Sequence, residues 1–170
     1  RTGKLPGLWR KALVTPILKK GSSDQVGNYR PISLCCVLCK IMESIINHAL
    51  VDFINQNNML KYEQFGFQKA KSCSLQLLEC TQKWINYLDQ KKPLDVVYID
   101  FQKEFDSVVH SKLLFQLRSF ISNRFLLSWI ASFLSCRTQA VSVNNTMSDS
   151  ISVTSGVPQG SVLGPTLFLL

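Results

Sequence analysis

The segment VVYIDFQKEFDS, residues 96–107, joins an apolar run to a run rich in acidic and aromatic side chains. Residues 96–99 are β-branched or aromatic, which predicts a buried central strand. Asp100 follows at the C-terminal end of that strand, where a carboxylate costs free energy unless it is paired or holds a metal. Hard oxygen ligands suit Mg²⁺, and Mg²⁺ suits phosphoryl transfer, which favours a metal site. The alternative is a carboxylate that caps the next turn.

The segment SGVPQGSVLGP, residues 155–165, has the pattern of a ligand-binding loop. Gly156 and Gly160 flank Pro158 and Gln159, and glycine allows the backbone to approach a ligand closely. Gln159 offers both a hydrogen-bond donor and an acceptor, which suits a sugar or a base. The alternative is an ordinary turn that leads into a helix.

Hydrophobic periodicity over the rest of the chain predicts a mixed fold. Apolar residues recur at spacings of three and four over residues 38–54, which indicates a strongly amphipathic helix. Because helices and strands follow one another without strict alternation, we expect an α+β fold. The expected elements are an extended segment at 12–18, helices at 38–54, 75–88, 112–120 and 124–134, strands at 138–143 and 151–154 after a turn at 144–145, and a helix beginning within 161–170.

The positive charge is concentrated in the first quarter of the chain. The 170 residues carry a formal net charge of +8, and residues 1–40 hold eight Lys/Arg against one acid, Asp24. A clustered basic segment beside a near-neutral body favours a polyanionic partner such as nucleic acid or nucleotide phosphates. The alternative is a plain basic surface.

Composition excludes some other classes of protein. With 46% hydrophobic and 18% charged residues, the chain is not a disordered tail. The chain contains no run of eighteen apolar residues, so no transmembrane helix is predicted. The basic start is not followed by the apolar segment that a signal peptide has. Because the chain starts on Arg1 and stops within the apolar run 167–170, we expect it to be a fragment.

The six cysteines fit free, buried thiols better than a metal site. Cys36 and Cys39 form a C-x-x-C pattern, but no second pair accompanies it, and zinc usually needs four ligands. Both lie with Cys35 in an apolar run, where cysteine behaves as a small hydrophobe. Free thiols indicate an intracellular, reducing compartment. A C-x-x-C redox protein is disfavoured, because the surrounding sequence lacks a thioredoxin-like context.

Several longer motifs, in fixed order, resemble one family over essentially all 170 residues. The chain is similar to the reverse transcriptase domain of non-LTR (LINE) retrotransposons of the jockey and chicken-repeat type. The segments that carry the resemblance are WRKA (9–12), TPILKKG (15–21), NYRPISL (28–34), QFGF (64–67), the palm motif A at 98–108, FLSCRTQ (133–139) and motif B at 155–165.

The resemblance implies a right-hand polymerase, with residues 1–90 mainly fingers and residues 91–170 mainly palm motifs A and B. It implies that Asp100 is the catalytic aspartate that binds two Mg²⁺ ions, with the backbone carbonyl of Phe101 as a further ligand. Phe105 matches the aromatic gate that selects deoxyribose over ribose, and Gln159 and Gly160 match residues that line the nucleotide pocket. Arg30 lies where basic fingers residues face template or triphosphate.

The implied reaction is RNA-directed DNA synthesis, in which a primer 3′-OH attacks the α-phosphate of a dNTP in a two-metal mechanism. Its partners would be template RNA, a DNA primer and dNTPs, and no membrane would take part. The protein would be intracellular, in the nucleus or in the cytoplasm with nuclear action. The host, the element's architecture, the target site and the oligomeric state are not indicated.

Three departures from the family pattern bear on activity. Gln68 stands where the family usually has arginine, so triphosphate binding would weaken unless Lys69 or Lys71 substitutes. Glu104 replaces a usual small alanine beside the gate and could repel triphosphate. Motif C, with its Y-A-D-D pattern, is absent from these residues, so we expect truncation before motif C and no primer extension by this chain alone. The alternative function is an inactive remnant with at most weak RNA binding.

Overall fold

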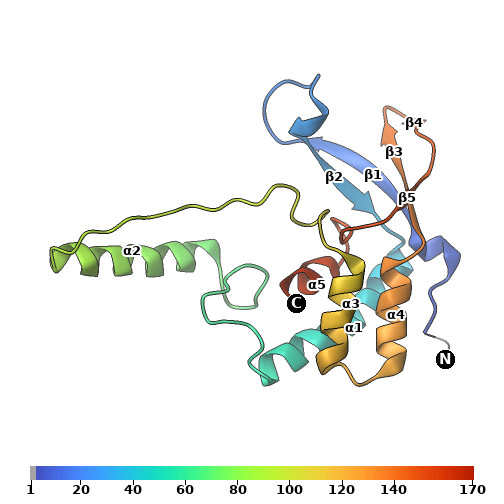
Figure 1. Ribbon diagram of the computed structural model, residues 1–170. Helices are drawn as coiled ribbons and strands as arrows, with labels where there is room; N and C mark the ends of the chain where they lie inside the picture. Colours follow the sequence, from blue (N-terminus) through green and yellow to red (C-terminus); the bar gives the residue numbers. More distant parts are fainter. Residues whose placement is uncertain (1–2) are drawn as a thin grey trace. The chain divides into compact units, whose positions relative to one another are not determined.

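The computed structural model describes residues 3–170 as two units. The first unit comprises the chain up to Val51 together with Lys103–Leu170, and the second comprises Asp52–Gln102. As expected, the fold mixes helices with a sheet (Figure 1). No helix in the described part of the chain is both long and apolar enough to span a membrane.

The first unit is built on a five-stranded sheet with the order β2-β1-β3-β4, in which β5 also pairs with β3. β1 and β2 are antiparallel, β1 and β3 are parallel, and β3 is antiparallel to both β4 and β5. The strands are β1 (Lys11–Leu18), β2 (Tyr29–Leu34), β3 (Arg137–Val143), β4 (Thr146–Met147) and β5 (Ile151–Val153).

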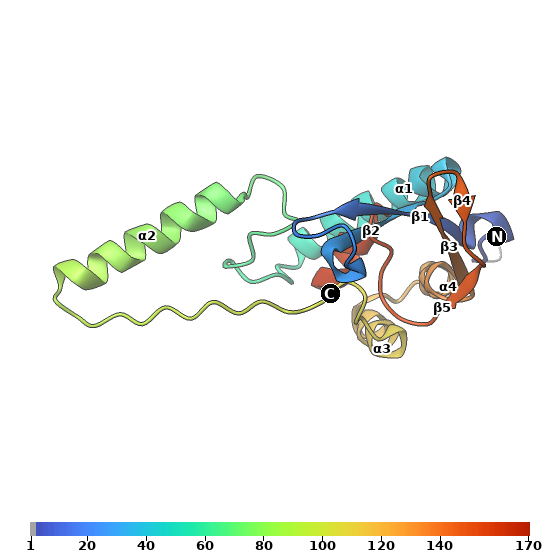
Figure 2. The same ribbon diagram turned by 90° about the horizontal axis from the view of Figure 1, so that it is seen from above.

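Helices enclose the hydrophobic core of this unit. Asn123 caps α4 by accepting hydrogen bonds from the backbone N–H groups of Phe125 and Leu126, and α3 runs beside α4 in both views (Figures 1 and 2). The helices are α1 (Val37–Gln56, in this unit up to Val51), α3 (His110–Phe120), α4 (Arg124–Leu134) and α5 (Gly164–Leu169), with short 3₁₀ helices at Gly7–Arg10 and Val26–Asn28. The fully buried side chains of these helices include Leu117, Ile130, Phe133 and Leu167, and Leu163 directly before α5 is also fully buried.

Most of the predicted elements are confirmed within a few residues. The turn at Asn144 and Asn145 has positive φ at both residues, 49° and 61°, as a tight hairpin turn requires. The strand directly after it is the two-residue β4, and the predicted strand at 151–154 is β5. β2 was not predicted; its Pro31 is tolerated because β2 is an edge strand.

The predicted central strand at 96–99 is wrong. These residues form no strand and are exposed, Val97 to 81% and Tyr98 to 83%. A buried strand needs neighbours that satisfy its backbone N–H and C=O groups, and no strand of the described residues pairs with this segment. Asp100 therefore follows an exposed extended segment rather than a buried strand.

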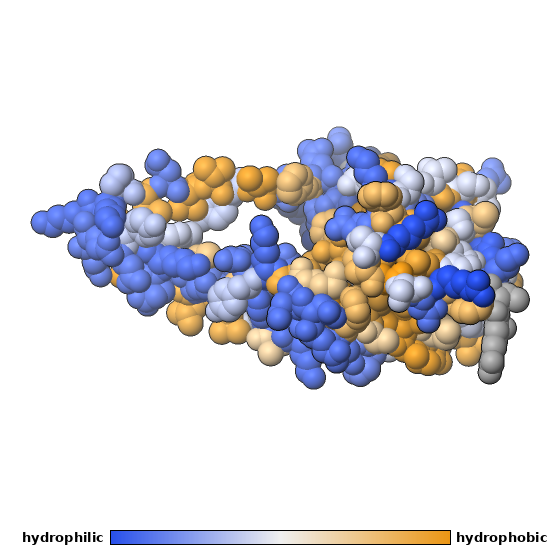
Figure 3. All heavy atoms as spheres, turned by 60° about the horizontal axis from the view of Figure 1, so that its bottom comes forward, coloured by the Kyte–Doolittle hydropathy of each residue, from blue (hydrophilic) through white to orange (hydrophobic). Residues whose placement is uncertain are grey.

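The second unit contains α2 (Cys73–Asp89), which the sequence predicts well in extent but not in packing. Ser72 caps the helix by accepting a hydrogen bond from Leu75 N. No residue of α2 is buried, and Leu78 on the apolar side of this helix is 66% exposed. Figure 3 shows apolar side chains at the surface of the molecule.

The six cysteines are free thiols, but the expectation that they are buried is only partly right. Cys39 is buried, whereas Cys73 and Cys136 are exposed and the other three are half-buried. Cys73 opens α2, in which no residue is buried, and Cys136 lies in the connection between α4 and β3.

Candidate nucleotide site

A turn at residues 103–109 and a loop at residues 155–161 are held together by backbone hydrogen bonds. Val157 N donates to Phe105 O at 2.8 Å, and Gly156 N donates to Val108 O at 2.8 Å. His110, the first residue of α3, places its Nε2 2.7 Å from Gly156 O. These contacts join two segments that lie about 50 residues apart in the sequence into one local structure.

Gly156 is required at this junction for two reasons. Its φ is +82°, a conformation that L side chains rarely adopt. A Cβ there would lie 2.8 Å from Asp106 Cα and 2.9 Å from Phe105 O, which are backbone atoms that cannot swing away. The close approach of loop 155–161 to turn 103–109 therefore depends on the missing side chain.

The other end of the loop is fixed to strand β2. Ser33 N donates to Gln159 O at 2.7 Å. Gly160 has a φ of +104°, and a Cβ there would lie 2.8 Å from Ser33 O. Loop 155–161 is thus held between β2 and turn 103–109, and this fixes the backbone that carries Gln159.

The Phe105 ring and the Gln159 amide lie on this frame. Phe105 is half-buried, and its ring stacks on Phe168 of α5 with centroids 4.7 Å apart and planes at 25°. Gln159 Nε2 donates to Asp106 Oδ1 at 3.2 Å. The adjacent residues Phe105 and Asp106 therefore carry a ring stacked on Phe168 and a carboxylate that accepts a hydrogen bond from the Gln159 amide.

A cavity of about 140 Å³ lies beside this amide. Its polar lining includes Ser33, Asp106, Arg137, Gln139, Ser155 and Gln159. Arg137 is only 3% exposed, and it donates to Phe133 O at 3.1 Å and to Cys35 Sγ at 3.6 Å while its guanidinium lies 4.9 Å from the Phe133 ring centroid. The cavity therefore combines a buried cation with amide, hydroxyl and carboxylate groups.

Glu43 of α1 fixes the end of the loop from the other side. Its side chain is fully buried, and Oε2 accepts hydrogen bonds from Val162 N at 2.8 Å and Leu163 N at 3.1 Å. Oε1 accepts from Cys39 Sγ at 3.4 Å. The sequence analysis missed Glu43, although its place in the series 39, 43, 46 and 50 puts it on the same helix face as three buried residues.

The thiols near Glu43 and Arg137 are protonated at neutral pH. Burial, and then the negative charge of Glu43, raises the pKa of Cys39 to about 12. Burial also raises the pKa of Cys35, although the positive charge of Arg137 acts in the opposite direction. Because the thiolate is the reactive form, both thiols behave as packing groups.

Comparison with known proteins decides the family. Residues 17–170 match the family described as "Reverse transcriptase (RNA-dependent DNA polymerase)". The chain belongs to the reverse transcriptase family. It is a domain of the non-LTR retrotransposon type, as its motifs indicated.

Three relatives illustrate this placement of the reverse transcriptase domain. The chain is 34% identical over 98% of its length to the "RNA-directed DNA polymerase from mobile element jockey" of Drosophila melanogaster, and 32% identical over 99% to the jockey protein of Drosophila funebris. It is 26% identical over 98% to the "Retrovirus-related Pol polyprotein from type-1 retrotransposable element R2" of Popillia japonica. The chain spans 18% of the length of each jockey protein and 23% of that R2 protein.

The structure brings together only some of the predicted site residues of the reverse transcriptase domain. In the first unit, the turn that carries Phe105 is hydrogen-bonded to the loop that carries Gln159 and Gly160, whereas the Phe105 ring itself packs on Phe168 and the core. Arg30 is exposed on β2 of the same unit, and strand alternation places it on the face opposite that of Ser33. Asp100 and Phe101 are exposed in the second unit, and their predicted roles stay predictions.

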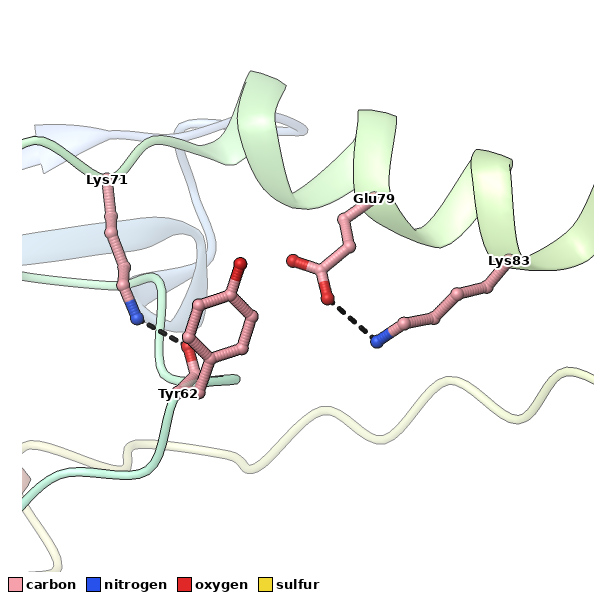
Figure 4. Close-up of polar contacts among 4 residues, drawn as sticks. All are labelled: Tyr62, Lys71, Glu79 and Lys83. Atoms are coloured by element: carbon pink, nitrogen blue, oxygen red, sulfur yellow. Dashed lines mark hydrogen bonds and ion pairs between the residues drawn. The ribbon is translucent and has the colours of Figure 1, made fainter.

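One predicted substitute for the fingers arginine is already engaged. Lys71 Nζ donates to Tyr62 O (Figure 4). It also donates to Gln64 O at 3.0 Å, and it lies 4.9 Å from the Tyr62 ring centroid and 5.1 Å from that of Phe65. Lys71 therefore stabilises its own loop, and of the two candidates Lys69 is the exposed one. Figure 4 also shows the ion pair between Glu79 and Lys83 on α2. The hydrogen bond to Glu79 within this pair raises the pKa of Lys83.

Proposed function

We propose that this domain forms part of the nucleotide site of an RNA-directed DNA polymerase that adds dNTPs to a primer 3′-OH. The observation that carries this proposal is the junction of turn 103–109 with loop 155–161, which places Phe105, Gln159 and Gly160 in one local structure. Family membership supports the reaction class. The relatives named as RNA-directed DNA polymerases extend far beyond the matched segment, so activity of the whole protein is part of the proposal.

In this proposal Phe105 is the gate for the sugar and Gln159 contacts the sugar or the base. A ring whose orientation is favoured by stacking on Phe168 can exclude a 2′-hydroxyl by steric overlap. Gln159 supplies hydrogen bonds from a fixed backbone position. We assign the right-hand arrangement, with fingers in residues 1–90 and palm in 91–170, and an intracellular location as parts of the same proposal.

Asp100 and the carbonyl of Phe101 are the groups proposed to bind Mg²⁺. Carboxylate and carbonyl oxygens are donors that Mg²⁺ accepts, and both residues are exposed. Residues 3–170 contain no group of three or more His, Cys, Asp or Glu side chains arranged to hold a metal ion. When bound, the ion would activate the attacking hydroxyl and neutralise the phosphates.

The gate is tested by nucleotide binding. Phe105→Val shortens the side chain, so the preference of the chain for a dNTP over the matching rNTP is expected to fall by about tenfold. The measurement is calorimetric titration of both nucleotides with Mg²⁺. Phe115→Leu, at an exposed phenylalanine of α3, is the matched control and should keep the preference. An unchanged preference in Phe105→Val would show that Phe105 is no gate.

RNA binding is proposed to centre on the basic residues of the first 40 positions. Replacing Lys19, Lys20 and Arg30 by alanine removes three exposed charges. Because each phosphate contact releases condensed counterions, the slope of log affinity against log salt is expected to fall by about 2 for single-stranded RNA. The measurement is fluorescence anisotropy with labelled RNA over a range of salt concentrations.

A matched control removes the same charge elsewhere. Lys61, Lys91 and Lys92 are also exposed and lie in the second unit, so their triple alanine variant should keep the salt slope. If both triple variants lose affinity and slope equally, binding depends on overall charge only. That result would favour the alternative, a remnant with weak RNA binding.

A further inference from the structure

We infer that Asp106 is a positioning residue that fixes the Gln159 amide with its carbonyl oxygen free to accept a hydrogen bond from the nucleotide sugar. This inference rests on the proposed function of the site. Its basis is the hydrogen bond from Gln159 Nε2 to Asp106 Oδ1 at 3.2 Å, which joins turn 103–109 to loop 155–161 through side chains.

The chemistry of the two groups determines the orientation of the amide. An ionised carboxylate has acceptors only, whereas the glutamine amide has two N–H donors and one acceptor oxygen. Asp106 can therefore be approached only by Nε2, because an oxygen facing a carboxylate would be repelled. Within residues 3–170, Oε1 and the second N–H of Gln159 remain available, so the site presents an oriented acceptor beside one donor.

The backbones that carry the two side chains are themselves held in place. Asp106 O accepts a hydrogen bond from Ser155 Oγ at 3.0 Å, and Asp106 N donates to Lys103 O at 3.0 Å. Gln159 O accepts from Ser33 N at 2.7 Å. Because both backbones are fixed before the ligand arrives, less backbone entropy is lost when the nucleotide binds.

The position of Asp106 in the chain links this acceptor to the gate. Asp106 directly follows Phe105, whose ring is oriented by Phe168 at 4.7 Å. One dipeptide therefore orients both an aromatic ring and, through Gln159, a hydrogen-bond acceptor. Of the groups on the deoxyribose of a dNTP, only the hydroxyl at C3′ can donate a hydrogen bond, so within the sugar it is the donor that this acceptor would recognise. Asp106 would thus act on selection for the 3′-hydroxyl without touching the nucleotide.

The first test observes the amide directly by ¹⁵N NMR of the 170-residue chain. Asp106→Ala removes the acceptor, so the Gln159 side-chain amide protons are expected to move to the positions of a free glutamine and to lose order. Asp106→Asn keeps an acceptor oxygen and should retain part of the effect. Asp149→Ala, at another exposed aspartate, is the control and should leave these resonances unchanged. Unchanged Gln159 resonances in Asp106→Ala would overturn the inference whatever the nucleotide result.

The second test compares the affinity for a dNTP with that for the matching 2′,3′-dideoxynucleotide. The wild-type chain is expected to prefer the dNTP by about tenfold, and Asp106→Ala should bring the ratio close to one. A merely structural role would weaken both nucleotides equally and leave the ratio unchanged, which would contradict the inference. If the wild-type chain binds neither nucleotide while the amide protons respond to Asp106→Ala, the proposed function fails and the positioning contact stands.

Discussion

Replacing Glu43 by alanine is expected to lower the free energy of unfolding by about 3 kcal/mol or more. The side chain is fully buried, and it accepts hydrogen bonds from the backbone N–H groups of Val162 and Leu163. Alanine would leave both donors without their partner and open a cavity beside Cys39. The measurement is urea-induced unfolding followed by circular dichroism.

Two further variants separate the effect of the buried hydrogen bonds from the effect of replacing a helical glutamate by alanine. Glu79→Ala removes a half-buried glutamate from α2 whose ion-pair partner Lys83 is exposed, and it should cost much less than Glu43→Ala. Glu43→Gln keeps the volume and one acceptor oxygen, so its loss should lie between those of the two alanine variants. Equal stability of Glu43→Ala and Glu79→Ala would show that the buried hydrogen bonds contribute nothing net.

The hydrophobic pattern predicts well those elements that need only local information. The series of apolar residues through Ile46 and Leu50 predicts α1, and the two asparagines at 144–145 predict the hairpin turn at β3. Each of these signals acts within a few residues, so no knowledge of distant partners is required. The family motifs point to Phe105, Gln159 and Gly160, which lie on hydrogen-bonded segments of the first unit, and their roles at the site stay predictions.

The failures share a different physical cause. Residues 96–99 are as apolar as a buried strand, but an extended segment becomes one only when other strands bond to its edges, and the described residues provide none. The apolar side of α2 is exposed for a similar reason, since no other helix or strand of the second unit covers it. Composition reports what a segment could bury, and only its neighbours decide whether it is buried.

The contacts that build the site could not be read from the sequence at all. Asp106 and Gln159 are separated by 53 positions, and Glu43 lies 119 positions before Val162. Nothing in the local pattern around either acid indicates its distant partner. Glu43 could have been noticed as an acid within a buried helical stripe, because such a group needs hydrogen-bond partners wherever they lie.

Gly156→Ala is expected to destabilise the first unit by about 4 kcal/mol, a larger loss than that from most single substitutions. Two costs add, since alanine is strained at a φ of +82° and its Cβ would overlap Asp106 Cα and Phe105 O. Relief requires loop 155–161 to move away from turn 103–109, which breaks the hydrogen bonds from Gly156 N and Val157 N. Nucleotide affinity should therefore fall together with stability, because Phe105 and Gln159 lose their common frame.

Thermal unfolding and dNTP titration of the same variant measure both effects. Gly27→Ala is the matched control, because its Cβ would meet no atom within 4 Å and its backbone is not left-handed, so both quantities should stay close to those of the wild type. A Gly156→Ala chain that unfolds at the wild-type temperature would mean that turn and loop tolerate separation. If that stable chain also binds the dNTP normally, the junction between them does not create the nucleotide site, and the proposal that Phe105 and Gln159 act together would have to be abandoned.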